Sequence, residues 1–407
     1  MQEVDFIPII LGTDINAYGT ARSFHEAYGV HSIALGREPL SFTQDSKIVT
    51  VQTFENFDTD DVFPSKMIEL GKELKKEGKS LLLISCSDGY TTLIAKYSDI
   101  LEKYYEFNYV SLELKDKLEN KKDFYEICEK YGLDYPATYV ITKENRDKIN
   151  LPFAYPCAVK PNDSIEFLHL KFEGKKKAYK AESKKELEEI VESIYKAGYT
   201  GELIVQDFIP GDSSTMGVLN AYVDRKGRVK MMCFARCLLD ECLPESIGNY
   251  NALLTEDAPE IYAQYERFLL DLGYKGFANF DVKYDCRDGK YKVFEINIRQ
   301  GRSSFYMTAA GCNFVTFLVD DLIYREDKKT VYFDKPYLWL YVDPSVLLKY
   351  VNPKDKREAE KYIKEKKYKF TQWYEKDKSL KRYLNYMRRR IATRRYYPVY
   401  QKGRENG

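Results

Sequence analysis

Short apolar runs alternate with segments of helical spacing along the first hundred residues. Each apolar run is bounded by glycine or polar residues, which is typical of a buried strand. The runs are FIPIIL at 6–11, HSIALG at 31–36, KIVTVQTF at 47–54 and LLLISCS at 81–87, and the helical segments are 20–28, 67–77 and 87–98. Strands that alternate with helices predict an open parallel α/β sheet, whose ligands bind at the carboxyl ends of the strands.

Polar residues follow these strands where a ligand would bind. A strand, a glycine loop and a helix can present backbone N–H groups to an anion. The G-x-G-x-x-G fingerprint of dinucleotide-binding loops is absent, so a plain βα turn explains the pattern equally well. The candidates at these strand ends are Asp14, Asn16, Arg22, Ser87 and Asp88. Their positions place them near a cleft, and no single one is diagnostic.

The chain beyond residue 112 predicts a mixture of helices and strands. Helices are expected within 112–131, 184–197, 261–272 and 314–324, and strands at 137–141, 157–160, 202–208, 217–224 and 229–238, with a late strand and short helix in 337–351. The lysine-rich stretch 164–181 predicts a mobile hairpin or loop. Lys160 closes an apolar strand before a proline, so its ammonium either points into a cleft or extends to solvent on the surface.

Residues 277–304, FANFDVKYDCRDGKYKVFEINIRQGRSS, predict two strands joined by a tight turn at Asp288-Gly289. Successive side chains of a strand point to opposite faces. One face of this hairpin is therefore apolar, and the other gathers Asp281, Glu295 and Asn297, with Arg299 at the end of the row.

Three oxygen donors in one row suit Mg²⁺, which phosphate oxygens and water complete. An arginine beside them could neutralise a phosphoryl group or an oxyanion. A half-solvated hairpin is the simpler explanation for any one carboxylate alone. The four polar residues together, beside a Gly-Arg-Ser-Ser loop, favour a metal site.

Composition limits the class of protein. A chain of 407 residues with 44% apolar residues is expected to fold as two or three globular domains. No apolar run reaches the roughly 20 residues that cross a bilayer, and the N-terminus lacks a basic region and cleavage site, so we expect a cytoplasmic protein. Eight scattered cysteines and three histidines argue against zinc. The phosphate-binding loop G-x-x-x-x-G-K-[ST] and the G-x-S-x-G elbow are also absent.

Charge is distributed unevenly. Residues 378–407 contain ten Lys or Arg and one acid, a charge of +9, so the first 377 residues carry −8 of the total of +1. Three interpretations of this basic tail stay open: a solvated tail packed on the acidic body, a clamp for an anionic nucleotide-linked substrate, or contact with an anionic membrane surface. Nucleic-acid binding is not expected from the rest of the chain.

Four features in order resemble the ATP-grasp superfamily of carboxylate–amine ligases. They are a lysine in KDKLENKKDFYEICEKYGL, a lysine in CAVKP, the strand and turn LIVQDFIPGD, and NFDV followed by FEINIRQG. The resemblance covers roughly residues 112–325. It implies an α/β (α+β ATP-grasp) fold with an N-terminal open parallel α/β domain at 1–111, a small central lobe at 112–205, a C-terminal lobe with the metal site at 206–330, and a strand and helix extension with the basic tail at 331–407.

The resemblance also implies a role for each matched residue. Lys117 and Lys160 would contact ATP phosphates, Gln206, Asp207 and Ile209 would form the adenine hinge, and Asp212 would lie near the ribose. Asp281, Glu295 and Asn297 would hold two magnesium ions, for which Mn²⁺ is an alternative. Arg236 would face the triphosphate, and Arg299, Gly301 and Arg302 the acyl phosphate and tetrahedral intermediate. The glycine- and serine-rich phosphate lid of the family is not evident, because 162–178 is lysine-rich.

FIPIILGTDINAYGTARSFHEAYG and FEINIRQGRSSFYMTAAG are similar to the bacterial D-aspartate ligase family. That similarity implies an enzyme that activates the β-carboxylate of D-aspartate with ATP and joins it to the lysine side chain of a peptidoglycan precursor. Arg22 or Arg302 would then hold the α-carboxylate. Two alternatives stay open, namely an ATP-grasp ligase for another acid or peptide, and a nucleotide-binding regulatory protein without catalysis.

Overall fold

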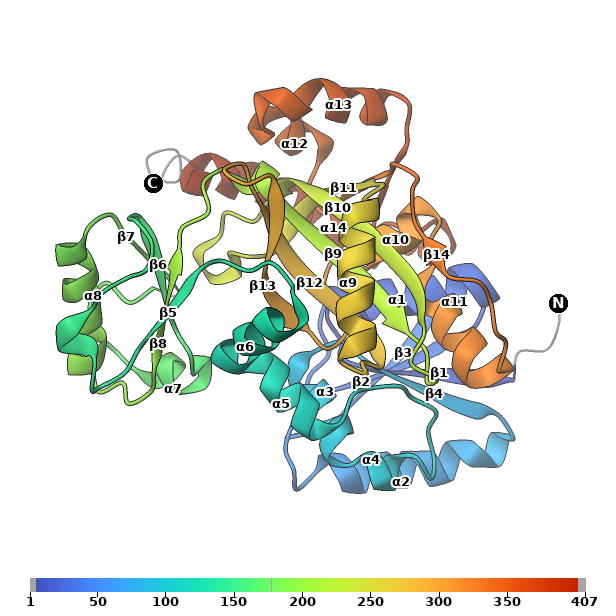
Figure 1. Cartoon of the computed structure of the whole chain (residues 1–407). Helices are drawn as coiled ribbons and strands as arrows, with labels where there is room; N and C mark the ends of the chain where they lie inside the picture. Colours follow the sequence, from blue (N-terminus) through green and yellow to red (C-terminus); the bar gives the residue numbers. More distant parts are fainter. Residues whose placement is uncertain (1–4, 177, 402–407) are drawn as a thin grey trace. The chain divides into compact units, whose positions relative to one another are not determined.

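The computed structural model describes residues 5–176 and 178–401, which group into two compact units (Figure 1). Unit 1 consists of Met1–Leu112, Ser213–Phe280 and Asn297–Gly407, and unit 2 of Glu113–Asp212 and Asp281–Ile296. The family resemblance implies four domains, each of them one continuous stretch of the chain. The two observed units are instead assembled from stretches that are separated in the sequence. Only the break near residue 112 is common to both.

Unit 1 begins with a four-stranded parallel sheet, as the alternating pattern predicts. Its strand order is β3-β2-β1-β4. The strands are β1 (Phe6–Leu11), β2 (Ser32–Gly36), β3 (Val49–Thr53) and β4 (Ser80–Ser85), and the helices are α1 (Ile15–Tyr28), α2 (Phe63–Leu74), α3 (Asp88–Lys96) and α4 (Ser98–Leu101). The first helix begins five residues earlier than its pattern indicates, because Asp14 caps it by accepting from the Ala17 N–H at 3.1 Å.

Alternate residues of this sheet enter two different cores. Leu82 and Ile84 of β4 pack in one core with Ala21 and Phe24 of α1. Leu81 and Leu83 pack in a second core, which includes Met67 of α2 and Leu93 of α3. A fully buried parallel strand needs apolar residues on both faces, which explains the continuous run LLLI.

The second sheet of the chain has eight strands in the order β13-β12-β9-β10-β11-β15-β16, with β14 beside β10. The strands are β9 (Met216–Val223), β10 (Val229–Asp240), β11 (Tyr250–Glu256), β12 (Gly276–Asp285), β13 (Lys290–Asn297), β14 (Val331–Tyr332), β15 (Leu338–Leu340) and β16 (Tyr368–Phe370). The associated helices are α9 (Pro259–Asp271), α10 (Phe305–Ala310) and α11 (Phe314–Val319). Cys233 and Ala235 of β10 pack in the same core as Tyr306 and Val315 from α10 and α11.

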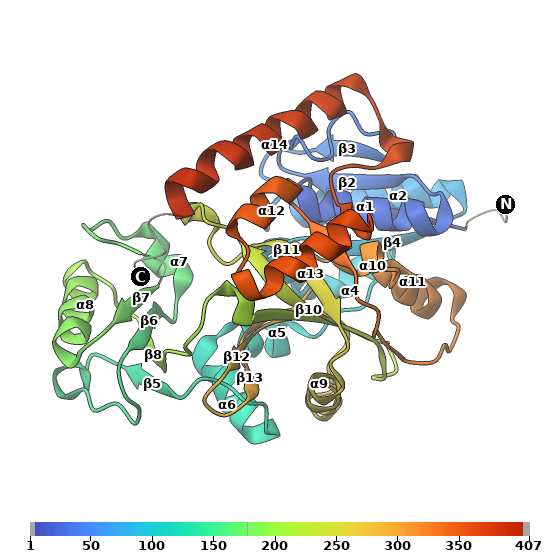
Figure 2. The same cartoon turned by 90° about the horizontal axis from the view of Figure 1, so that it is seen from above.

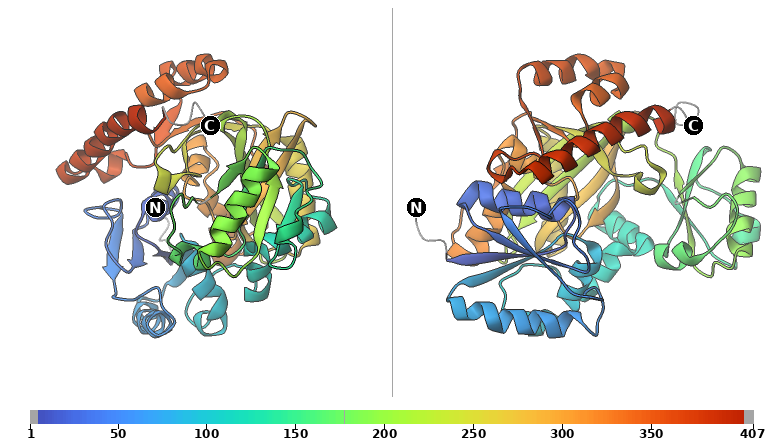
Figure 3. Two further views of the ribbon diagram at one scale, coloured as in Figure 1. Left: turned by 90° about the vertical axis from the view of Figure 1, so that its left-hand side faces the viewer. Right: turned by 180° about the vertical axis from the view of Figure 1, so that it is seen from behind.

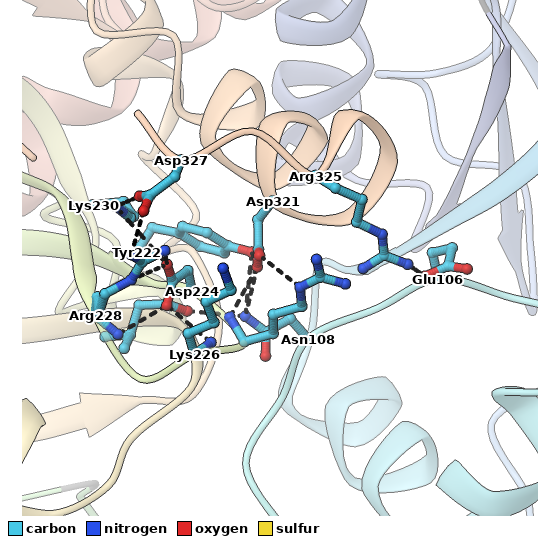
Figure 4. A network of polar contacts seen from close by, with 12 residues as sticks. Glu106, Asn108, Tyr222, Asp224, Lys226, Arg228, Lys230, Asp321, Arg325 and Asp327 are labelled. Atoms are coloured by element: carbon cyan, nitrogen blue, oxygen red, sulfur yellow. Dashed lines mark hydrogen bonds and ion pairs between the residues drawn. The ribbon is translucent and has the colours of Figure 1, made fainter. Parts of the chain in front are cut away.

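A polar network joins the β9–β10 turn to the chain that follows α11 (Figure 4). Asp321 accepts from the Tyr222 hydroxyl at 2.8 Å and from the Arg225 N–H at 3.0 Å, and burial raises the pKa of its carboxyl. Asp224 accepts from the guanidinium of Arg228 at 2.7 Å. The network satisfies two buried carboxylates inside unit 1, so this end of the sheet has a fixed register.

Unit 2 contains a four-stranded antiparallel sheet in the order β5-β8-β6-β7. The elements are β5 (Thr138–Ile141), β6 (Cys157–Pro161), β7 (Tyr179–Ala181), β8 (Leu203–Asp207), α5 (Leu112–Glu119), α6 (Lys121–Tyr131), α7 (Ser164–His169) and α8 (Lys184–Lys196). The helical segment expected within 112–131 is interrupted at Asn120, whose side chain caps α6. The stretch 164–181 is not wholly a loop, because Asp163 caps a helical turn by accepting from the Glu166 N–H at 2.9 Å.

The C-terminal part of unit 1 is helical. It comprises α12 (Pro344–Tyr350), α13 (Pro353–Lys364) and α14 (Leu380–Tyr400), and Figures 2 and 3 show α14 as a long helix along the outside of this unit. Single 3₁₀ turns lie at 75–77, 146–148, 213–215, 244–246 and 375–377, and one π turn at 320–324. No helix of the described residues is long and apolar enough to cross a membrane.

The basic tail is a helix rather than a loosely held segment. Ser379 caps α14 by accepting from the Arg382 N–H at 3.3 Å. The Tyr397 side chain is fully buried and donates to the Asp240 carbonyl at 2.7 Å, and Arg390 forms an ion pair with Asp343. The tail therefore packs on the rest of unit 1, in line with the first of its three interpretations. Residues 402–407 lie outside the described part.

Candidate active site

The β12–β13 hairpin closes in unit 2 over four residues, 286–289, which is two residues longer than a loop of Asp-Gly alone. The Gly289 N–H donates to the Asp285 carbonyl at 2.9 Å, and Gly289 has φ 75°, which favours glycine. The Asp285 carboxylate accepts from Arg287 and Lys292, both at 2.7 Å. The hydrogen bond from Arg287 is the main cause of its pKa lying far below the usual range. The turn is thus fixed by a buried acid between two cations.

The polar residues of the two strands differ in their surroundings. Asp281 is half-buried and Glu295 is exposed. Lys283 is buried and donates to the carbonyls of Ile209 at 2.9 Å and Gly211 at 2.8 Å. Strand alternation places it on the same face of β12 as Asp281. The structure shows that it fixes the hinge segment after β8.

The expected adenine hinge lies at the end of β8 and is held from several sides. Arg287 binds the Asp207 carboxylate through two hydrogen bonds, of 3.0 and 2.6 Å. The Asp207 N–H donates to the Ala137 carbonyl at 2.9 Å. Ile209 is buried, and Asp212 is exposed in the turn beyond it. These contacts fix the backbone of the segment 207–209. The family resemblance implies that backbone groups of this segment bind adenine.

Lys160, at the end of β6, lies beside residues of β8 and β13 in unit 2. Its Nζ is 3.4 Å from the Oε1 of buried Gln206 and 5.0 Å from the ring centre of Phe294. Tyr125 donates to the Phe294 carbonyl at 2.7 Å. Burial, and more weakly the charge of Glu295, raises the pKa of Tyr125. The structure thus brings Lys160 and Gln206 to the strand that carries Glu295.

Lys117 occupies a different environment. It lies on the exposed side of α5 and pairs with Glu113, one turn earlier, at 2.7 Å. Its neighbour Lys115 is the buried lysine of this helix and pairs with Glu119 at 2.7 Å. An exposed pair of this kind contributes little to stability, so Lys117 can readily exchange Glu113 for a stronger anion.

In unit 1, the loop after β13 approaches β12 closely. The Asn297 Nδ2 donates to the Asn279 Oδ1 at 3.1 Å, so the amide oxygen of Asn297 faces away from Asn279. A Cβ on Gly301 would lie 2.8 Å from the same Asn279 oxygen, which explains a glycine at this position. The Asn279 Nδ2 is buried without a hydrogen-bond partner among the described residues. A ligand oxygen would satisfy that donor.

Arg299 lies at the N-terminus of α3. Its guanidinium pairs with Asp88 through two contacts, Nε to Oδ1 at 2.7 Å and Nη2 to Oδ2 at 3.0 Å. Ser87 caps the same helix by accepting from the Tyr90 N–H at 3.3 Å. Asp14 caps α1, and burial raises the pKa of its carboxyl despite the charges of Arg302 and Arg299. Two helix N-termini, two arginines and two acids therefore meet at the carboxyl end of this sheet.

Asn16 has a structural position rather than an open one. It is almost fully buried, and its Nδ2 donates to the carbonyls of Cys86 at 3.1 Å and Gln300 at 3.3 Å. Gln300 in turn donates to the Ser85 carbonyl at 2.8 Å. These bonds attach the loop that carries Arg299 to the start of α1 and to the end of β4. Gln300 was not among the sequence candidates, although it lies between two that were.

Comparison with known proteins identifies the family. No protein-family model matches the sequence. A D-aspartate ligase from Enterococcus faecium (strain Aus0004) is 45% identical over 395 residues, which cover 94% of each chain. The chain belongs to the D-aspartate ligase family.

The fold of this D-aspartate ligase family member is found in several solved ATP-grasp structures. They include an N5-carboxyaminoimidazole synthetase from Staphylococcus aureus with ADP (TM-score 0.59, 13% identity, 83% of each chain) and an L-amino acid ligase from Bacillus licheniformis (TM-score 0.55, 15% identity, 79% of this chain and 75% of that one). The ATP-grasp α/β fold is thereby confirmed. The family match makes the protein an ATP-dependent carboxylate–amine ligase.

Two arginines that the sequence favoured as ligand contacts are engaged elsewhere. Arg22 is buried, pairs with Glu26 at 2.7 Å and stacks on Phe305 and Tyr374. The same guanidinium donates to three backbone carbonyls, those of Phe370, Thr371 and Trp373. Arg22 therefore holds the C-terminal segment on α1, and its role in binding a substrate carboxylate is not supported.

Arg236 is likewise surrounded by acids. Its three guanidinium nitrogens pair with Glu256 at 2.7 Å, Asp355 at 2.7 Å and Glu358 at 2.9 Å. These carboxylates raise its pKa further, although burial acts in the opposite direction. With every nitrogen paired, Arg236 joins β10 and β11 to α13, and the expected contact with the triphosphate is not supported.

Arg302 differs from both. Its guanidinium lies 4.8 Å from the ring centre of Tyr341, and none of the described carboxylates forms an ion pair with it. Stacking on an aromatic face leaves the edge nitrogens of a guanidinium able to bind an anion. Of the two arginines expected to hold a substrate carboxylate, Arg302 is the one without an ion pair among the described residues.

Proposed function

We propose that the protein joins the β-carboxylate of D-aspartate to the lysine side-chain amine of a peptidoglycan precursor, with conversion of ATP to ADP and phosphate. The single observation that carries this proposal is the 45% identity over 94% of both chains with a D-aspartate ligase. The substrates are consequently a small amino acid and a peptide or nucleotide-linked cell-wall precursor, and the expected site of action is the cytoplasm.

The chemistry requires an activated acid. A carboxylate does not react with an amine near neutral pH, because oxide is the leaving group. Transfer of the terminal phosphoryl group of ATP to the carboxylate forms an acyl phosphate, and attack by the amine then expels phosphate. Such transfers depend chiefly on positioning and on neutralising negative charge.

Unit 2 supplies the groups for ATP. Backbone atoms of Asp207 and Ile209 would read the adenine edge, which the fixed hinge supports. Lys160 would contact the phosphates, supported by its place beside Gln206 and β13. Lys117 would leave Glu113 to join it, and Asp212 would approach the ribose.

Asp281, Glu295 and Asn297 would hold Mg²⁺, as two ions, with Mn²⁺ as a substitute. Two carboxylates and an amide oxygen fit a hard cation, and Glu295 and Asn297 lie two residues apart on one face of β13. Asn297 donates its amide N–H to Asn279, which leaves the amide oxygen of Asn297 to face a metal ion. Bound magnesium would neutralise charge on the phosphate oxygens.

Unit 1 supplies the groups for the amino acid. Arg302 would bind the α-carboxylate of D-aspartate, and Arg299, held in one plane by Asp88, would face the oxyanion together with backbone N–H groups near Gly301. The Asp14 carboxylate suits the ammonium group of the amino acid. The raised pKa of Asp14 supports this pairing, because a bound cation would restore its ionised form.

The test measures product formation with defined substrates. Purified protein, Mg-ATP, D-aspartate and a lysine-containing nucleotide-linked muropeptide should release ADP and phosphate and yield the aspartylated muropeptide by mass spectrometry. L-aspartate, D-glutamate and a muropeptide acetylated on lysine serve as controls and should give no product. Turnover with another acid but not with D-aspartate would reject the proposed substrate and retain the ligase.

A further inference from the structure

Helix α14 carries an exposed surface that the ligase reaction does not use. The helix Leu380–Tyr400 contains seven basic residues and no acidic residue. The basic residues are Lys381, Arg382, Arg388, Arg389, Arg390, Arg394 and Arg395. Its inner side packs on unit 1 through Tyr386, Thr393 and Tyr397, all buried.

The inward arginines are tied to the protein. Arg382 pairs with Asp377 at 3.1 Å and donates to the Phe42 carbonyl at 3.0 Å. Arg389 donates to the Ser41 hydroxyl at 2.6 Å. These contacts fix the rotation of the helix about its axis. They therefore determine which residues of α14 face away from unit 1.

The opposite face has two adjacent rows. Leu380, Leu384 and Ile391 are 74%, 49% and 42% exposed, and they follow one another at helical spacing. Lys381, Arg388 and Arg395 form the second row at intervals of seven residues, which is about two turns. Arg388 and Arg395 form no ion pair among the described residues. Lys381 pairs with Asp45 at 3.2 Å. A row of exposed aliphatic side chains thus runs beside two arginines that have no ion pair among the described residues.

We propose that α14 docks the enzyme on an anionic lipid surface. An interfacial helix inserts its aliphatic side chains at the headgroup boundary while arginines beside them contact lipid phosphates. Tyr383 and Tyr400, both exposed, suit the same boundary. The helix is about 30 Å long, so several headgroups could be engaged at once. The alternatives are an acidic protein, a polynucleotide or a second copy of the chain. A lipid surface fits best because the aliphatic row, from Leu380 to Ile391, runs beside the cationic row, from Lys381 to Arg395.

The inference goes beyond the proposed ligase function and does not depend on it. The contact would be peripheral and reversible by salt, because screening weakens the arginine row.

The experiment is sedimentation of the full chain with vesicles. With vesicles of phosphatidylglycerol and phosphatidylcholine at 0.1 M salt, most of the protein should pellet, and with phosphatidylcholine alone little should. Arg388→Gln with Arg395→Gln should weaken the partition roughly 25-fold. Leu384→Gln with Ile391→Gln should weaken it about tenfold or more.

Matched controls come from α9 of the same unit, where Arg267 and Leu270 are also exposed. Arg267→Gln with Leu270→Gln should leave the partition unchanged. All variants should keep the ATPase rate with a soluble acceptor. Failure to pellet with the anionic vesicles would overturn the proposal. So would a dimer by light scattering that Leu384→Gln with Ile391→Gln abolishes, or equal loss of vesicle binding in the α9 control.

Discussion

Arg236 and Arg302 of unit 1 are the same residue type in two different surroundings. Arg236 lies on β10 with an acid on each of its three nitrogens, whereas Arg302 lies in the loop after β13 over the ring of Tyr341. Both arginines have the residue type that phosphate and carboxylate recognition requires. Only Arg302 has charge that a ligand could use. The acids of the β12–β13 hairpin show a similar contrast, between the buried and paired Asp285 and the exposed Glu295.

The largest effect is expected at Glu295, an exposed acid, compared with Asp285, a buried acid held by two cations on the same hairpin. Glu295→Gln should lower ATP turnover by about 10³-fold because a phosphate-neutralising ligand is lost. Its unfolding midpoint in urea should not change. Asp281→Asn should behave in the same way.

Asp285→Asn is the matched control for Glu295→Gln. It should lower the free energy of unfolding, because Arg287 and Lys292 lose their counter-charge, while kcat stays within a few fold. If Glu295→Gln kept near-normal turnover, the proposed metal site would be wrong.

The next effect tests the two arginines directly. Arg302→Gln should lower kcat/KM for D-aspartate about 100-fold at unchanged stability, since one charged contact to a carboxylate is lost. Arg236→Gln should instead cost about 3 kcal/mol of unfolding free energy, because three acids are left together, with KM unchanged. Steady-state kinetics and urea denaturation on both variants measure the contrast. The reverse pattern would show that the assignments are exchanged.

A smaller effect concerns pH. Burial opposes ionisation of Asp343, but hydrogen bonds from Ser345 and the guanidinium groups of Arg390 and Arg394 lower its pKa to about 2. The folded pKa lies below the unfolded value of about 3.9, so this stabilisation is complete above about pH 4 and is lost as pH falls towards 2.

Asp343→Asn should remove that part of the pH dependence and cost about 1.5 kcal/mol at pH 7. Urea midpoints measured between pH 2.5 and 7 on both proteins would show it. Parallel curves for the wild type and Asp343→Asn would contradict the assigned role.

The smallest effect concerns orientation of a metal ligand. Asn279→Ala removes the acceptor that holds the Asn297 amide, so the Mg²⁺ concentration for half-maximal turnover should rise about tenfold. Asn279→Asp keeps an acceptor oxygen and should restore most of the response. An unchanged Mg²⁺ titration for Asn279→Ala would exclude this positioning role.

Local patterns were sufficient to predict much of the fold. The parallel sheet, the hairpin at Asp288-Gly289 and the strand that ends at Lys160 all follow from periodicity and turn residues, which depend on neighbours in the chain. The hinge and metal residues were placed by family resemblance, and their roles stay predictions.

The partners of Arg22 and Arg236 could not be predicted from local sequence patterns. Arg22 donates to carbonyls around Phe370, some 348 residues later, and Arg236 pairs with Asp355, 119 residues later. Nothing in the local sequence indicates such partners. Lys283 and Gln300 were overlooked for the same reason, because each acts through backbone carbonyls of distant segments.

The hydrogen bonds between Asp377 and the loop before β3 can form only late in translation. Asp377 accepts from the Lys47 N–H at 2.6 Å, from the Ser46 hydroxyl at 2.9 Å and from Tyr18 at 2.8 Å. Lys47 is synthesised 330 residues before its partner, a delay on the order of 20–60 s. During translation the loop before β3 therefore lacks these contacts until the 3₁₀ turn 375–377 has been made.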